Sequence, residues 1–383
     1  MMFAGGVPVL REAWGMTAAE AGSVQSTFNL AYAVSLVVTS WLSDRWGARQ
    51  VFLGSTLLTA LTGLALALFA RSYESGLLLF GLFGLCHGGS YTPAIMLVAQ
   101  GAPAERRGGA IGLVLAAASI GYAGSIAISS SLAASLGYHT AFALCAGATA
   151  LAAATGWLAC RRRPRHAPGT RGAGVVGRAR GDRRQSVCIT LGYTAHCWEL
   201  LGMWAWMPAF LLGAFAAASD GPGASGGLWI GIALHLSGCL ASLVTGRASD
   251  RYGRRAVLIA LAAAGALCSF AAGWLSASPA ALLLAFTALY GFAALGDSPV
   301  LSAAIADAVP ARSLGFALAV RSILGFGAGG LAPLAFGAVR DALPGEEGWI
   351  VAFSLLGAGG LLATFFALLL PRARQRTTGG SPP

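Results

Sequence analysis

Long apolar stretches separated by short polar loops follow one another along the whole chain of 383 residues. Eleven stretches have the roughly 20 residues that an α-helix needs to cross the hydrocarbon core of a bilayer. They are expected near residues 20–41, 51–70, 76–99, 108–133, 139–160, 187–212, 226–246, 256–274, 279–305, 314–338 and 348–370. Backbone groups in a bilayer must be satisfied within the protein, and a helix does this within one segment. The short alternating strands of a β-barrel are absent from the sequence. The pattern predicts an all-α polytopic membrane protein.

Composition agrees with this class, because 56% of the residues are hydrophobic and only 10% are charged, against about a quarter charged in a soluble domain. All 25 basic residues are Arg, so the Lys of an ATP-binding phosphate loop is missing and direct ATP drive is not expected. The seven Cys form no CxxC pair, and neither HExxH nor a nucleophile elbow occurs. We expect no enzyme activity, no cofactor and no metal site.

One long polar segment divides the chain. Residues 161–184 hold nine Arg against a single Asp, which is typical of a flexible basic linker. With this linker in the cytoplasm, 21 Arg fall inside and three outside, as the positive-inside rule requires. The net charge of +11 therefore indicates membrane topology, not nucleic-acid binding. We predict an N-terminal bundle over 1–160, a linker over 161–185, a C-terminal bundle over 186–371 and a cytoplasmic tail over 372–383.

The two halves repeat a short loop motif. The sequence SDRWGAR at 43–49 recurs as SDRYGRR at 249–255, an offset of 206 residues that indicates a duplication with parallel repeats. Gly47 and Gly253 allow a tight reversal without Cβ strain. Asp44 and Asp250 are expected at helix C-termini, where the helix dipole disfavours a carboxylate, so each needs a cationic or helix N-terminal partner.

These paired loops resemble motif A of the major facilitator superfamily, and the resemblance extends over the linker, the number of spans and the orientation. It implies two parallel-related six-helix bundles around a central cavity. It also implies a gating role for Asp44, Arg45, Gly47, Arg49, Asp250, Arg251, Gly253 and Arg255. The N-terminal copy departs from the pattern at Ser40 and Ala48, where a Gly and a basic residue are usual. A solvated turn that only sets topology is the alternative.

The resemblance requires six spans before the linker, and only five complete ones are present. Residues 1–10 look like the last third of a first span. We expect either that translation starts upstream, with roughly 10–15 further apolar residues, or that the chain lacks most of one helix.

Polar side chains inside a span are costly and mark functional sites. Tyr193, His196 and Glu199 recur every third residue in 187–212, so we expect their face to line a cavity or the bundle interior. A polar clamp between helices is the alternative. Asn29 and His235 correspond at the offset of 206 and are expected to face the cavity.

Asp297 and Arg321 lie on consecutive spans at depths that differ by about 3 Å, from the helical rise per residue. We expect them to pair. The pair is interpreted either as a structural salt bridge between two helices or as a site in which Arg321 binds an anionic substrate.

Together these features favour a secondary transporter that takes up a small organic anion by alternating access. Glu199, Asp297 and His196 supply titratable groups for proton coupling. The fifth-helix Gly-Pro motif of drug–proton antiporters is missing, because residues 120–124 contain no Pro. A proton-coupled drug or metabolite efflux antiporter and a non-transporting membrane sensor stay open as alternatives. We expect a monomer in the cytoplasmic (inner) membrane whose partners are the lipid bilayer, a small-molecule solute and protons.

Overall fold

The computed structural model describes residues 1–101, 107–161, 183–218 and 225–371. Helices form almost all of this part of the chain, which contains no β-strand. The elements are α1 (Met2–Ala13), α2 (Ala18–Trp46), α3 (Ala48–Phe69), α4 (Tyr73–His87), η1 (Gly88–Ser90), α5 (Thr92–Gly101), α6 (Arg107–Leu136), α7 (Tyr138–Arg161), α8 (Arg183–Ala217), α9 (Gly226–Gly231), the π-helical turn η4 (Ile232–Leu236), α10 (Ser237–Tyr252), α11 (Arg254–Ala272), η5 (Gly273–Leu275), α12 (Ala280–Ala308), α13 (Ala311–Ala342) and α14 (Gly345–Leu368).

All eleven predicted stretches are helical, and the all-α polytopic prediction is confirmed. Within the described residues, nine helices are long and apolar enough to cross a membrane. Two predicted spans fall outside that group. The 29-residue α2 carries Glu20, Gln25, Asn29 and Asp44 among its apolar residues. The stretch 76–99 is not one helix, because the 3-10 turn at Gly88–Ser90 separates α4 from α5.

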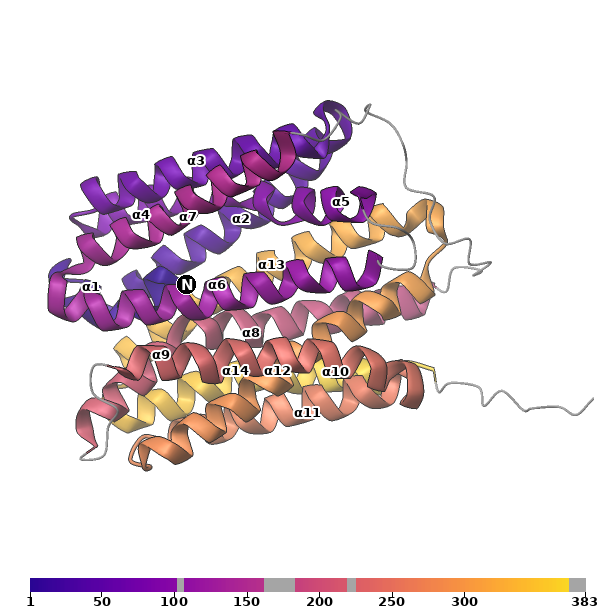
Figure 1. Ribbon diagram of the computed structural model, residues 1–383. Helices are drawn as coiled ribbons and strands as arrows, with labels where there is room; N and C mark the ends of the chain where they lie inside the picture. Colours follow the sequence, from indigo (N-terminus) through magenta and orange to yellow (C-terminus); the bar gives the residue numbers. More distant parts are fainter. Residues whose placement is uncertain (102–106, 162–182, 219–224, 372–383) are drawn as a thin grey trace, which may run out of the picture.

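Successive spans run in opposite directions, with α4 and α5 together forming one span and α9, η4 and α10 another, so their ends gather at two faces of the molecule (Figure 1). We call the face where α7 ends at Arg161 and α8 begins at Arg183 the linker end, and the opposite face the far end. Helices α1–α7 and α8–α14 form two groups, which we call the N half and the C half (Figure 1). Helix α13 packs against α2 of the N half as well as against α8 of its own half. The domain boundaries given above stay predictions, and most of the predicted linker and all of the predicted tail lie outside the described residues.

The two halves contact each other near the far end. The backbone N–H groups of Ala18 and Ala19, in the first turn of α2, donate to Oδ1 and Oδ2 of Asp341 on α13, both at 2.7 Å. One helical turn further, Gly22 lies so close to Pro333 that an added Cβ would collide with the Pro333 backbone. Glycine at this position therefore permits the close contact of α2 with α13.

A cavity of about 1850 Å³ lies between the two halves. Along α2, its lining extends from Gln25 in the far-end part of the helix to Asp44 near its last turn. Asp44 is exposed, so the cavity is accessible from the linker end, whereas the contacts of α2 with α13 close the far end.

Candidate solute-binding site in the central cavity

Arg321 on α13 places a cation in the lining of the cavity. Its Cζ lies 4.2 Å from the ring centroid of Tyr193 on α8, within the range of a cation–π contact. Its Nη1 donates to Oγ of Ser302 on α12 at 3.2 Å. Its Nε has no hydrogen-bonding partner among the described residues. A guanidinium has five N–H donors, so Arg321 keeps donors for an anionic group.

The charge of the lining is strongly asymmetric. Of the described residues that line the cavity, Arg321 is the only Arg and Asp44 the only acidic residue. Asp44 lies in the last turn of α2 at the linker end, whereas Arg321 is 7% exposed and lies inside the bundle. The buried part of the cavity is therefore suited to a negatively charged group.

His196 on α8 is a further ionisable residue in the lining of the cavity. Its Nδ1 lies 3.0 Å from Oδ1 of Asp297, and its Nε2 lies 3.1 Å from Oγ of Ser298. His196 and Ser298 line the cavity, whereas the carboxylate of Asp297 lies behind them at 3% exposure. The histidine therefore connects the cavity to a buried carboxylate.

The predicted pair of Asp297 with Arg321 does not form. Within the described residues Arg321 forms no ion pair, and the ion-pair partner of Asp297 is His196. The sequence gave similar depths in the membrane for Asp297 and Arg321, but it did not give the direction in which each side chain points around its helix axis. Ser298 and Ser302, one turn apart, face the cavity and Arg321, whereas Asp297 is rotated about 100° from Ser298 and faces α8.

Glu199 lies in the interior of the C half and not in the lining of the cavity. It is 3% exposed, and its Oε1 accepts a hydrogen bond of 2.6 Å from the Ser269 hydroxyl on α11. The same hydroxyl contacts the hydroxyl of Tyr290 on α12. Glu199 lies six positions after Tyr193, which turns the two side chains about 120° apart on α8. The predicted face of Tyr193, His196 and Glu199 therefore begins at the cavity and ends in the bundle interior. The spacing of residues in the sequence gave no signal that Ser269 or Tyr290 would lie beside Glu199.

Of the two residues matched by the repeat, Asn29 lines the cavity and accepts a hydrogen bond of 3.2 Å from Gln25. His235 does not line it, contrary to our expectation. Its ring packs against Tyr122 and Trp204, with centroid distances of 5.4 Å to each. The π-helical turn that contains His235 changes the register of this helix relative to its repeat partner.

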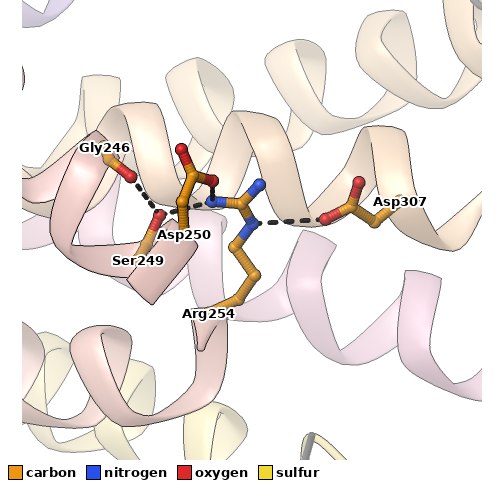
Figure 2. Close-up of polar contacts among 5 residues, drawn as sticks. All are labelled: Gly246, Ser249, Asp250, Arg254 and Asp307. Atoms are coloured by element: carbon orange, nitrogen blue, oxygen red, sulfur yellow. Dashed lines mark hydrogen bonds and ion pairs between the residues drawn. The ribbon is translucent and has the colours of Figure 1, made fainter. Parts of the chain in front are cut away.

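In the C-half loop motif, Asp250 finds its cationic partner four residues later. Nη1 of Arg254 lies 2.5 Å from Oδ1 of Asp250, and Nε of Arg254 lies 3.2 Å from Oδ2 of Asp307 on α12 (Figure 2). Arg255 donates from Nη2 to the carbonyl of Leu368 at 3.1 Å. Arg254 and Asp307 were absent from the predicted site. The i, i+4 spacing of Asp250 and Arg254 was the available signal.

The N-half motif shares the turn but lacks this partner. Gly47 and Gly253 have φ angles of 91° and 86°, the left-handed region that favours glycine. Ala48 stands where the repeat has Arg254, and among the described residues Asp44 has no ion pair. The guanidinium groups of Arg45 and Arg251 instead lie over the rings of Trp41 and Tyr252. The gating role of both motifs stays a prediction.

Comparison with known proteins identifies the family. The Major Facilitator Superfamily pattern matches residues 1–238 and 201–383, which together span the chain. The protein therefore belongs to the major facilitator superfamily of membrane transporters.

The chain is also similar to individual transporters. It is 29% identical over 342 residues to a probable 4-methylmuconolactone transporter of Cupriavidus pinatubonensis, which covers 82% of this chain and 75% of the relative. It is 29% identical over 139 residues to a probable sulfoacetate transporter of Cupriavidus necator, covering 35% of this chain and 31% of that relative. The fold matches the nucleoside transporter NupG, with a TM-score of 0.75 at 16% identity over 96% of this chain and 94% of that one. It also matches the inward-open xylose transporter XylE of E. coli, with a TM-score of 0.75 at 16% identity over 98% and 93% of the two chains.

Proposed function

We propose that this protein takes up a small organic anion across the cytoplasmic membrane by alternating access, coupled to protons. The single observation that carries the proposal is Arg321, a cation inside the central cavity whose Nε has no hydrogen-bonding partner and which has no carboxylate partner among the described residues. An unpaired charge in a low-dielectric interior is costly. An anionic solute that binds at Arg321 offsets this cost during each transport cycle.

The names of the two relatives support an organic acid as cargo. Sulfoacetate carries a carboxylate and a sulfonate, and 4-methylmuconolactone carries a carboxylate on an unsaturated lactone ring. The carboxylate that both compounds carry is planar and accepts paired hydrogen bonds from a guanidinium. We assign the anion to Arg321 and the remainder of the solute to the largely uncharged lining around it.

Proton coupling is assigned to the buried acids of the C half. His196 is in contact with both the cavity and Asp297, so a proton can move between solvent in the cavity and this pair. Glu199, with Ser269 as its hydrogen-bonding partner, is a second proton site deeper in the same half. In this proposal the linker end faces the cytoplasm, and the present arrangement is the inward-facing state.

The test is uptake of labelled sulfoacetate, 4-methylmuconolactone and benzoate into proteoliposomes. Arg321→Gln removes charge-assisted hydrogen bonds worth about 1.5–3 kcal/mol, so we expect uptake efficiency (kcat/KM) to fall by roughly 10- to 100-fold. Arg247→Gln is the matched control, since Arg247 is an exposed arginine near the end of α10. Undiminished anion affinity in Arg321→Gln, or a cationic cargo, would contradict the proposal. Because Asp297 is not paired with Arg321, adding Asp297→Asn to Arg321→Gln should not restore uptake.

A further inference from the structure

A panel of aromatic side chains forms part of the cavity wall in the N half. Phe28 and Tyr32 lie one turn apart on α2, and Phe83 and His87 lie one turn apart on α4. All four line the cavity and are half-buried. Their rings pack against one another both along each helix and across from α2 to α4. The centroid distances lie between 5.7 and 6.3 Å, and the interplanar angles are 9–39°. We call these four residues the aromatic wall.

The aromatic wall reaches the helix that carries the cation. Phe326 on α13 meets Tyr32 edge-on, with ring centroids 5.6 Å apart at 68°. Phe326 lies five residues after Arg321, which is about 7.5 Å along the helix axis. Phe326 also lines the cavity. Five positions also turn the two side chains about 140° apart around α13, so one molecule contacts both by extending across the cavity that both residues line, with its anionic group at Arg321 and its ring at this junction.

The exposed parts of these rings favour a particular kind of neighbour. Aromatic rings carry a quadrupole with a negative face and a positive edge, so they prefer offset or edge-on contacts with other π systems. A saturated ring of the same size covers similar apolar area without that preference. Aliphatic side chains exclude water as well as aromatic ones do, so the exclusion of water alone does not require several aromatic rings with similar orientation.

We propose that the cavity selects organic anions that carry a planar unsaturated ring, with the anionic group at Arg321 and the ring against the aromatic wall and Phe326. This inference rests on the proposed function and specifies the substrate class of the same site. Tyr32 is its central residue, because it contacts Phe28, His87 and Phe326.

The test compares benzoate with cyclohexanecarboxylate, which share a carboxylate and a six-membered carbon ring but differ in the π system. Each anion competes with labelled benzoate for binding to the purified full-length protein. In the wild type we expect benzoate to bind about five- to tenfold more tightly. Tyr32→Leu and Phe326→Leu should each reduce this ratio toward one by weakening benzoate binding. Tyr32→Phe should keep the ratio, because the ring remains.

Phe69→Leu is the matched control, since Phe69 is exposed at the end of α3 and does not line the cavity. Thermal stability of each variant shows whether it folds, and Phe326→Leu keeps the test informative if Tyr32→Leu fails to fold. Equal affinity for the two acids in the wild type, or an unchanged ratio in both leucine variants, would overturn this inference. The proposed function fails separately, if no organic anion is bound or moved in an Arg321-dependent way.

Discussion

At the scale of single residues, sequence reasoning predicted which polar side chains lie inside the membrane but not which of them meet. Arg321, His196, Glu199 and Asp297 are all buried, as their positions within apolar stretches indicated. Depth follows from counting residues along a helix, whereas direction depends on how each helix is rotated in the bundle. That rotation is set by packing between helices far apart in the sequence. It explains why Asp297 meets His196 and not Arg321.

The first prediction concerns Glu199. Its carboxyl is enclosed by α8, α11 and α14, with Gly265 and Gly360 close to its oxygens and Ser269 as a donor. Glu199→Gln keeps the volume and an acceptor for Ser269 but cannot exchange a proton. We expect it to abolish proton-driven accumulation of the solute in proteoliposomes while leaving counterflow exchange, which needs no net proton movement, near the wild-type rate.

Glu347→Gln is the matched control for this measurement, because Glu347 is an exposed carboxylate near the start of α14. Accumulation that persists against a gradient in Glu199→Gln would remove Glu199 from the coupling path. The coupling role would then be assigned to Asp297. In that case Asp297→Asn should abolish proton-driven accumulation while leaving counterflow exchange near the wild-type rate.

At the scale of elements, local sequence signals predicted turns better than breaks within helices. The two Gly in the repeated motifs adopt nearly the same backbone conformation, as a duplicated turn requires. By contrast, the predicted span 76–99 ran through the break between α4 and α5 at Gly88–Ser90, although the Gly-Gly-Ser run and the following Pro93 were readable break signals. Close contacts explain why glycines stand there, since a Cβ on Gly88 or Gly89 would collide with Ser35 or Ser55.

The second prediction tests the turn after α10. Gly253 has φ of 86° and ψ of 145°, a conformation in which a Cβ is strained, so Gly253→Ala should destabilise the folded protein by about 1–2 kcal/mol. The measurement is the thermal unfolding midpoint of the detergent-solubilised protein, which should fall. Gly246→Ala is the matched control, because Gly246 lies within helical α10 and a Cβ there meets open space. Its midpoint should stay constant or rise. Equal midpoints for the two variants would contradict the strain argument.

At the scale of the whole molecule, the internal repeat predicted two related halves, and the family comparison agrees with that architecture. The contacts that hold the halves together could not be predicted, because they join residues far apart in the sequence, such as Ala18 and Asp341, which are 323 positions apart. The local capping box of Thr17 and Glu20 was a readable signal for the start of α2. The second carboxylate at that helix start, supplied by α13, depends on the packing of the complete molecule.

The last prediction concerns this junction. Both carboxylate oxygens of Asp341 accept backbone N–H groups from the first turn of α2, where the helix dipole also favours negative charge. Because Asp341 joins the halves at the far end, its contacts exist only while that end is closed, and they stabilise the closed arrangement over any open one. Asp341 is exposed, so we assign the two hydrogen bonds about 1 kcal/mol. Asp341→Ala should therefore shift the equilibrium roughly fivefold toward a far-end-open state.

The shift can be measured by electron–electron double resonance between spin labels at Arg71→Cys and Ala277→Cys in a cysteine-free background. Both positions are exposed at the far end, one in each half. We expect Asp341→Ala to increase the population at longer distances. Glu347→Ala is the matched control, since Glu347 is an exposed carboxylate near the start of α14 in the C half and its loss should leave the far-end distances unchanged. The same distance distribution in Asp341→Ala and the wild type would show that the close contact of Gly22 with Pro333 is sufficient to keep the far end closed. A larger population of the open state would make Asp341 a determinant of which side of the membrane the solute-binding cavity faces.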